Sequence, residues 1–129
     1  MVQVWFGGKV VGLEPSVHVD ARGTLTTMAF DQYGFAAVRG FIVQGPNGVV
    51  RGGHGHREGR QLLLQLSGEI EIELRYHSDI ERIVLDEKLR AILIEPPIWA
   101  LQTYWGNNPS MLVLCDTPYD PADYLREPV

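Results

Sequence analysis

One segment of the chain alternates strictly between apolar and charged residues. Ile70, Ile72 and Leu74 share one parity, while three glutamates and Arg75 occupy the other. Side chains of a β-strand point alternately to opposite faces, so this pattern predicts a strand with one buried and one solvated face. The glutamates are typical of a wet sheet face, and we do not interpret them as an acidic active site.

Other short apolar segments are separated by glycine and proline at intervals of about ten residues, which is typical of all-β sandwiches and barrels. We predict strands at residues 2–6, 25–30, 38–43, 61–67, 69–75, 82–85, 91–94 and 111–115. The strand at 61–67 is apolar on both parities and is expected to be covered on both sides.

The breaks between these strands carry turn residues. Gly68 is predicted to form a tight turn, and residues 95–97 and 106–110 are predicted loops because proline cannot donate to a central ladder. Residues 121–126 alone favour a short C-terminal helix, with Asp120 as its N-cap and Pro121 at its first position.

Size and composition indicate a single folded domain spanning residues 1–129, with 45% hydrophobic and 21% charged residues. No apolar stretch is long enough to span a membrane, and the first residues lack the pattern of a secretory signal, so we expect a cytoplasmic protein without a membrane partner. The lone Cys115 lies in an apolar run and is interpreted as a buried hydrophobe.

The formal net charge is −5, and the basic residues are not clustered, so no nucleic-acid surface is expected. A few arginines inside one pocket would still bind a pyrophosphate, because the guanidinium group pairs with phosphate oxygens through two hydrogen bonds.

Candidate chemistry is concentrated between Arg51 and Gln61. This stretch contains His54 and His56, two of the four histidines, and three glycines between Arg51 and His56. Residues two apart on an extended segment point to the same side, so both imidazoles are expected to face one cavity. A purely structural role for the pair is the alternative.

The spacing of Gly48, His54, His56, Gln61 and Gly68 resembles the first motif of the cupin family, with Gln61 where an acid is usual. The resemblance implies an all-β, RmlC-like jelly-roll β-sandwich. Metal-binding cupins usually add an acid and a later histidine, which this sequence lacks, so we expect no metal.

A narrower resemblance covers most of the chain. Its elements occur in family order as residues 20–25 (DARGTL), 51–57 (RGGHGHR), Gln61 with Gly68, 97–99 (PIW) and 119–126 (YDPADYLR). Together they resemble the WxcM-like cupins, which are sugar-nucleotide 3,4-ketoisomerases. The resemblance implies a homodimer without cofactors that moves the ketone of a dTDP-linked 4-keto-6-deoxyhexose from C4 to C3.

The resemblance also implies that His54 is the base and His56 the proton shuttle, although the sequence allows the two roles to be exchanged. Imidazoles suit this chemistry because their ordinary pKa lies near neutrality. Most substrate-binding candidates have an alternative role. Arg51 could bind the pyrophosphate or the enediolate, and Gln61 could orient a histidine or bind a sugar hydroxyl. Trp99 could contact the sugar or base or lie in the core, Arg22 could bind the nucleotide or close a turn, and Arg57 could bind the ligand or be solvated. Tyr104 is a further candidate for binding the substrate.

The sequence departs from this family at Ala100, where a histidine usually follows the tryptophan. Three interpretations follow: a ketoisomerase in which His54 and His56 suffice, with Tyr104, Tyr33 or His18 as a replacement polar group; an isomerase or epimerase of another nucleotide sugar; and a non-catalytic binder of sugar nucleotides. A metal-dependent cupin is a fourth.

Overall fold

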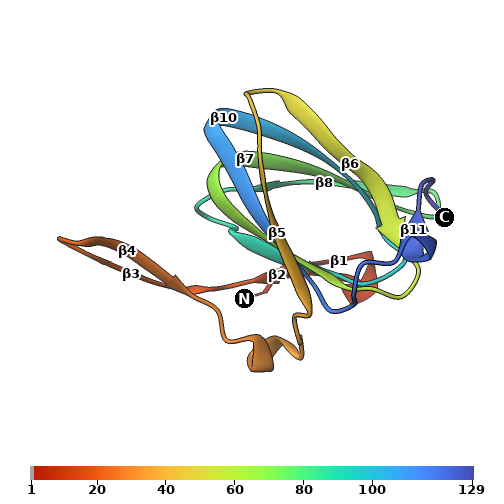
Figure 1. The fold of residues 1–129 in the computed structure, drawn as a ribbon, viewed down its shortest axis with the longest axis horizontal. Helices are drawn as coiled ribbons and strands as arrows, with labels where there is room; N and C mark the ends of the chain where they lie inside the picture. Colours follow the sequence, from red (N-terminus) through yellow and green to blue (C-terminus); the bar gives the residue numbers. More distant parts are fainter. Residues whose placement is uncertain (1) are drawn as a thin grey trace.

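The protein, described here from a computed structural model over residues 2–129, is built from one curled antiparallel sheet and a projecting hairpin (Figure 1). The strands are β1 (Val4–Trp5), β2 (Val10–Leu13), β3 (Ser16–Asp20), β4 (Gly23–Thr27), β5 (Arg39–Gln44), β6 (Val49–His56), β7 (Gln61–Tyr76), β8 (Asp79–Leu85), β9 (Ala91–Ile94), β10 (Trp99–Cys115) and β11 (Tyr124–Leu125). Three 3₁₀ turns accompany them: η1 (Phe6–Gly8), η2 (Phe30–Tyr33) and η3 (Pro121–Asp123). This all-β architecture confirms the predicted jelly roll.

Strands β7 and β10 pair along nearly their whole lengths and form the spine of the sheet. The first half of β7 also pairs with β9, and its second half pairs with β8. Strand β10 likewise pairs with β6 in its first half and with β5 in its second. Because each long strand changes neighbours midway, the sheet curls over and encloses its own core (Figure 1).

The predicted turn at Gly68 is wrong, since β7 continues from Gln61 to Tyr76 through this glycine. Gly68 has a φ of 72°, and the β7–β10 register shifts there, so that residues 106–109 of β10 bulge opposite it. The predicted loop at 106–110 is therefore a bulge inside β10. It accommodates Pro109, because a bulged residue need not donate to the ladder.

The core lies inside the curl, and the alternation in the sequence predicts its lining correctly. Ile70, Ile72 and Leu74 have no solvent-exposed surface, while the intervening charged residues face outward. A second apolar cluster covers the outer face, where Leu62 and Leu64 pack beneath the chain around η2. Strand 61–67 is thus buried on both sides over residues 61–65, as predicted.

Several sequence-based boundaries are wrong. The strand predicted at 25–30 overlaps only β4, which ends at Thr27, and Phe30 begins η2. The partner strand β3 was not predicted. The predicted strand at 2–6 shortens to Val4–Trp5, and β2, β6 and the first half of β10 were not predicted. The strands at 38–43, 82–85 and 91–94 correspond to β5, β8 and β9.

The predicted helix at 121–126 is one 3₁₀ turn of three residues. Asp120 caps it as expected, accepting a hydrogen bond from the Ala122 amide at 3.0 Å. The chain then becomes extended, because Tyr124 and Leu125 pair with β6 and form β11.

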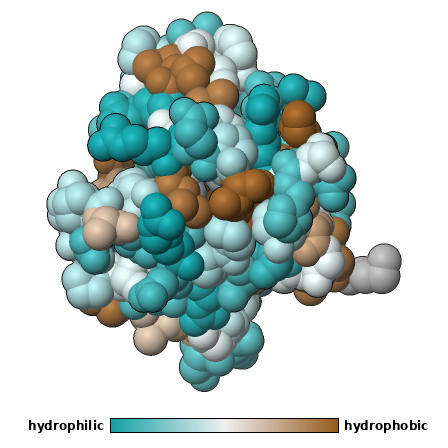
Figure 2. All heavy atoms as spheres, turned by 90° about the vertical axis from the view of Figure 1, so that its right-hand side faces the viewer, coloured by the Kyte–Doolittle hydropathy of each residue, from teal (hydrophilic) through white to brown (hydrophobic). Residues whose placement is uncertain are grey.

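The surface at the β11 end is mostly hydrophilic, with separate apolar patches (Figure 2). Larger exposed apolar side chains lie on the projecting hairpin, where Val19 is 75% and Leu25 61% exposed. Among residues 2–129, no helix has the length and apolarity needed to cross a bilayer.

Candidate active site

Strand β6 carries both histidines into the curl, and a bulge sets their position. Ala100 of β10 pairs with His54, whereas Leu101 pairs with Gly52, so Gly53 is the additional residue. Gly52 and Gly53 have φ values of 83° and 81°, a conformation that favours glycine. The bulge re-aims the end of the strand, as bulges near binding sites commonly do.

The two imidazoles lie edge to face, with ring centroids 5.6 Å apart and planes at 90°. The ring of Tyr124 on β11 packs against both, at 4.9 Å from His54 and 4.6 Å from His56. His56 is 6% exposed and His54 is half-buried. Both histidines therefore point into one enclosed pocket, as the spacing predicts.

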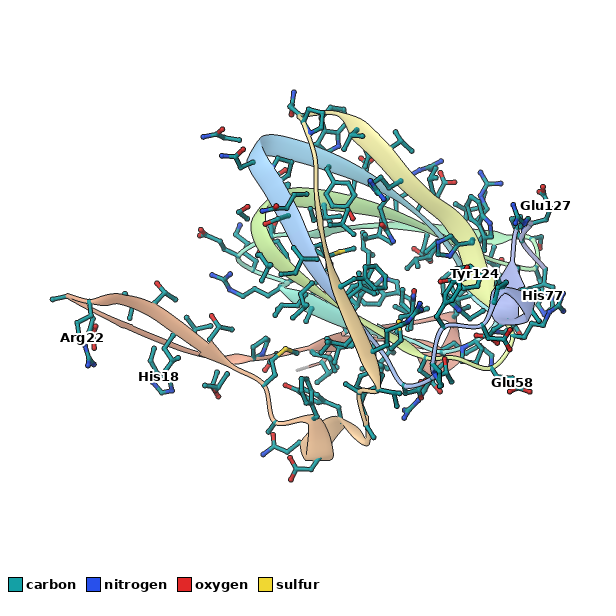
Figure 3. The ribbon with its side chains drawn as sticks, in the orientation of Figure 1. His18, Arg22, Glu58, His77, Tyr124 and Glu127 are labelled. Atoms are coloured by element: carbon teal, nitrogen blue, oxygen red, sulfur yellow. The ribbon has the colours of Figure 1, made fainter. Side chains whose placement is uncertain are left out.

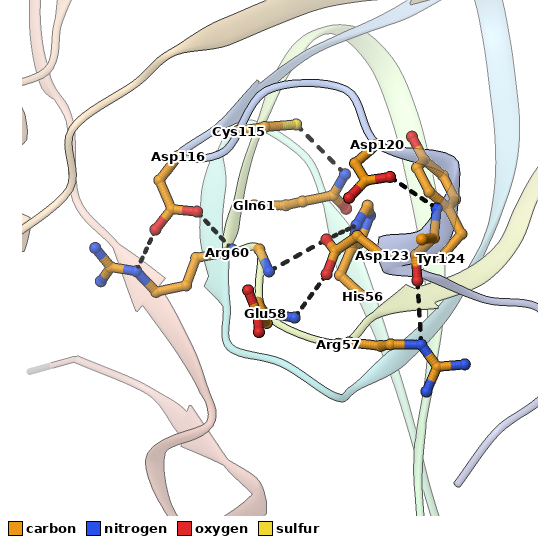
Figure 4. A network of polar contacts seen from close by, with 12 residues as sticks. His56, Arg57, Glu58, Arg60, Gln61, Cys115, Asp116, Asp120, Asp123 and Tyr124 are labelled. Atoms are coloured by element: carbon orange, nitrogen blue, oxygen red, sulfur yellow. Dashed lines mark hydrogen bonds and ion pairs between the residues drawn. The ribbon is translucent and has the colours of Figure 1, made fainter.

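Asp123, in η3, orients His56 (Figure 4). Its Oδ2 lies 3.1 Å from His56 Nδ1, and the carboxylate also accepts hydrogen bonds from the backbone amides of Glu58 and Gly59. A carboxylate accepts only from a protonated ring nitrogen, so Nδ1 carries the hydrogen and Nε2 keeps its lone pair.

Two ring nitrogens at this place lack a protein partner. His56 Nε2 and His54 Nδ1 are buried and form no hydrogen bond with any residue from 2 to 129. A buried polar atom without a partner costs free energy and is commonly explained by a bound ligand or a catalytic role. The pair is therefore poorly explained by packing alone.

The electrostatic environment keeps both imidazoles neutral at neutral pH. Burial lowers the pKa of His54, and the neighbouring His56 lowers it further. Burial also lowers the pKa of His56, with partial compensation by the hydrogen bond to Asp123. The pKa of Asp123 is itself lowered, against the effect of burial, by the Glu58 amide and His56, so its carboxylate stays ionised.

Two cavities meet at His54 and Gln61. One, of about 90 Å³, is lined also by Arg51, Gln102 and Phe41. The other, of about 10 Å³, lies between the two histidines, Gln61 and Ala100. Both histidines, Arg51 and Gln61 thus come together, and His54 borders both cavities.

Gln61 does not orient either histidine. Its Nε2 donates to the thiol sulfur of Cys115 at 3.6 Å, and Arg39 donates to the same sulfur at 3.4 Å. Arg39 also contacts the Tyr124 hydroxyl at 3.4 Å. Cys115 is 2% exposed, which confirms its prediction as a buried residue.

The other substrate-binding residues predicted from the sequence do not line these two cavities. Arg22 is paired with Asp20 at the hairpin tip, far from Tyr124 (Figure 3). Arg57 donates from the exposed surface to the Ala122 carbonyl. Trp99 donates to the Arg126 carbonyl. Tyr104 is fully buried in the core and does not line either cavity.

The replacement groups proposed for the histidine missing at Ala100 also lie elsewhere. His18 is on the exposed hairpin (Figure 3), and Tyr33 packs on the outer apolar cluster. The donor set does not suit a metal either, because Gln61 and Ala100 stand where an acid and a histidine would be. No three His, Cys, Asp or Glu side chains of residues 2–129 converge as ligands.

Sequence reasoning assigned no role to Asp123, Tyr124 or Gln102. The first two lie in the YDPADYLR segment, which was noted only as part of a resemblance. Its two acids three residues apart are a helix-cap signal, and nothing in the sequence says that the second contacts His56. Gln102 lines the cavity because β10 pairs with β6, and no sequence pattern predicts that pairing.

The sequence is similar to one family of known proteins. The sequence matches the WxcM-like, C-terminal family (FdtA) over residues 10–129. It is 27% identical over 111 residues to the TDP-4-oxo-6-deoxy-α-D-glucose-3,4-oxoisomerase of Aneurinibacillus thermoaerophilus, covering 84% of this chain and 80% of the relative.

Solved structures agree with the sequence match. The sugar 3,4-ketoisomerase QdtA of Thermoanaerobacterium thermosaccharolyticum, in complex with TDP, superposes with a TM-score of 0.85 at 25% identity, covering 92% of this chain and 88% of that one. The TDP-quinovose 3,4-ketoisomerase WlaRB of Campylobacter jejuni gives 0.82 at 25% identity, covering 92% of each chain.

Proposed function

We propose, from the premise that the chain belongs to the WxcM-like family, that it is a 3,4-ketoisomerase acting on a dTDP-linked 4-keto-6-deoxyhexose. The observation that carries the proposal is the pair His54 and His56, enclosed together with two unpartnered ring nitrogens. Relatives named as 3,4-ketoisomerases of TDP-sugars support the reaction and the substrate class.

The reaction needs only proton transfers. The C4 carbonyl acidifies the hydrogen on C3, so a base breaks the C3–H bond and the electron pair forms a C3=C4 enediolate with charge on the C4 oxygen. That oxygen gains a proton, C4 is then protonated, and the C3 hydroxyl loses its proton to become the new ketone. Neutral imidazoles accept and return these protons near neutral pH.

The division of roles follows the exposure of the two rings. His54 borders the larger cavity together with Arg51 and is assigned as the base at C3. His56 lies deeper, and Asp123 holds its Nδ1 hydrogen, so its Nε2 is assigned to relay protons between the sugar oxygens. The same carboxylate stabilises the imidazolium that forms during the relay.

The binding residues are assigned by position. Arg51 and Gln61 line the cavities at His54 and are assigned to the pyrophosphate or sugar oxygens. Trp99 lies beside Gly53 of the β6 bulge and Arg57 donates to Ala122 of η3, outside the two cavities, so both are assigned to the nucleotide rather than to the sugar. Arg22 lies at the tip of the projecting hairpin, so it would contact a ligand only where the hairpin itself contacts that ligand.

A homodimer is part of the proposal. Within residues 2–129, strands β3 and β4 pair only with each other and expose apolar side chains, including Val17, Val19 and Leu25. Such a hairpin gains apolar burial against a second copy. Light scattering at several concentrations tests this, and a monomer at all of them would overturn it. The cytoplasm stays the predicted compartment.

The test of function is proton NMR of dTDP-4-keto-6-deoxyglucose with the purified protein in deuterated water. We expect a 3-keto product with deuterium at C4, lost in His54→Asn and retained in the control His77→Asn, since His77 lies in the β7–β8 turn. Shifted substrate signals without product would indicate the binding-only alternative, and turnover of another nucleotide sugar alone would indicate a changed substrate.

A further inference from the structure

We propose that Gln102 is a catalytic residue whose side-chain amide donates a hydrogen bond to the sugar oxygen that becomes negatively charged, and that Tyr104 is the positioning residue for this amide. The inference rests on the proposed function and concerns the same cavity. It assigns the group that stabilises the negative charge on the sugar oxygen, a role that was not assigned to the histidines.

The register of β10 places Gln102 on the reacting side of the sheet. Ala100, Gln102 and Tyr104 alternate with outward residues and are buried, with Gln102 only 9% exposed. Gln102 pairs with Arg51 on β6, two pairs along from that of Ala100 and His54. Its side chain lines the cavity of about 90 Å³ that also contains His54 and Arg51.

Tyr104 fixes the orientation of the amide. Its hydroxyl donates to Gln102 Oε1 at 3.0 Å. Tyr104 is fully buried, and burial raises its pKa to about 12, so it remains a protonated donor. With Oε1 occupied, the amide nitrogen is left to face the other way.

The amide group of Gln102 lies against Gly52 in the lining of the cavity. A Cβ built on Gly52, which lines that cavity, would lie 3.5 Å from Gln102 Nε2. Among residues 2–129, no acceptor takes a hydrogen bond from this nitrogen. A nearly buried side chain thus presents an oriented donor beside His54 without a protein partner.

This donor fits the charge that the reaction develops. Removal of the C3 proton puts negative charge on the C4 oxygen, and a pre-oriented N–H stabilises such an oxygen without reorganisation. Ala100, the neighbouring inward position, offers no polar group. Gln102 supplies a donor from the same strand face and leaves Arg51 for the pyrophosphate.

Three variants separate the roles. Gln102→Met removes the donor at similar length, Gln102→Glu keeps an acceptor for Tyr104 but loses the N–H, and Tyr104→Phe removes only the hydroxyl. We expect kcat to fall about 100-fold in both Gln102 variants, the effect typical of one lost oxyanion donor. Tyr104→Phe should lower kcat about 3- to 10-fold, the value of one hydrogen bond. Tyr33→Phe, on the outer cluster, is the matched control.

A double variant tests the link between the two residues. If Tyr104 acts only through Gln102, Tyr104→Phe lowers kcat no further in the Gln102→Met background. TDP binding by calorimetry, unchanged within threefold, shows that each variant is folded.

Two results would overturn the inference: Gln102→Met with wild-type kcat, or a Tyr104→Phe effect of equal size in both backgrounds. Absence of isomerisation by the wild-type protein would instead refute the proposed function itself.

Discussion

Replacing Asp123 by asparagine tests whether the Asp123 carboxylate sets the tautomer of His56. In the native protein Oδ2 accepts the Nδ1 hydrogen of His56 and the Gly59 amide, while Oδ1 accepts the Glu58 amide at 2.8 Å. Asparagine that keeps its oxygen toward Glu58 turns an NH₂ group toward His56 and Gly59. His56 must then present a lone pair at Nδ1 and carry its hydrogen at Nε2.

The expected cost follows from these contacts. A hydrogen bond to a charged group contributes about 1.5–3 kcal/mol and a neutral one about 1 kcal/mol, so the variant should lose roughly 2–4 kcal/mol of unfolding free energy. The side chains of His56 and Asp123 are 8% and 12% exposed, so solvent replaces these bonds poorly. Because His56 has the wrong tautomer, kcat should fall about 10²- to 10⁴-fold, the range of general acid–base catalysis.

Three measurements check this prediction: urea denaturation, kcat by NMR, and the ¹⁵N shifts of the His56 ring, which report the tautomer. Asp120→Asn is the control, because Asp120 caps the same 3₁₀ turn and asparagine is an equally good cap. A changed tautomer with wild-type kcat would refute the role of His56, and an unchanged tautomer would refute the assignment of Asp123.

Three further predictions concern pH, the backbone at Gly68 and the core. Burial lowers the pKa of His54 and His56 below 6.5, so the folded chain binds these protons more weakly than the unfolded chain. The free energy of unfolding should therefore be highest above pH 6.5 and decline as the pH falls below that value. The acid limb of the kcat/KM profile should also lie below pH 6.5. Urea titrations and rate profiles test this, and a limb above 6.5 would contradict it. Gly68→Ala should lower the free energy of unfolding by about 1–3 kcal/mol in urea denaturation, because φ is positive and its Cβ would lie 2.6 Å from the Trp105 carbonyl oxygen. An unchanged midpoint would refute this close approach of β7 and β10 at Gly68. Ile72→Ala should cost about 2–5 kcal/mol and the outward Glu71→Ala less than about 0.5, whereas equal effects would contradict the assigned faces.

The sequence predicted those features that follow from the geometry of a single strand. The alternation around Ile72 predicts the buried face, and the two-residue spacing of His54 and His56 predicts that they face one cavity, because both follow from strand geometry. Gly68 misled because glycine serves equally in a turn and at a bend of a continuous strand. Only the pairing of β7 with β10 decides between these alternatives.

The partners of the histidines could not be predicted for the same reason. Asp123 is 67 residues from His56 in sequence, and its contact depends on β11 returning beside β6. Tyr104 was expected as a ligand contact, but its position on β10 places it in the core, and its neighbour Gln102 lines the cavity instead.

The long β7–β10 ladder has a consequence for how the protein acquires activity. Its registered pairs join residues far apart in the chain, such as Gln61 with Cys115, so loop closure precedes much of the native pairing and folding should be slow. Strand β6 pairs with β10, so the histidines are aligned only after β10 is in place. Catalytic activity should therefore recover at the rate of the slowest refolding phase, with no active intermediate before it.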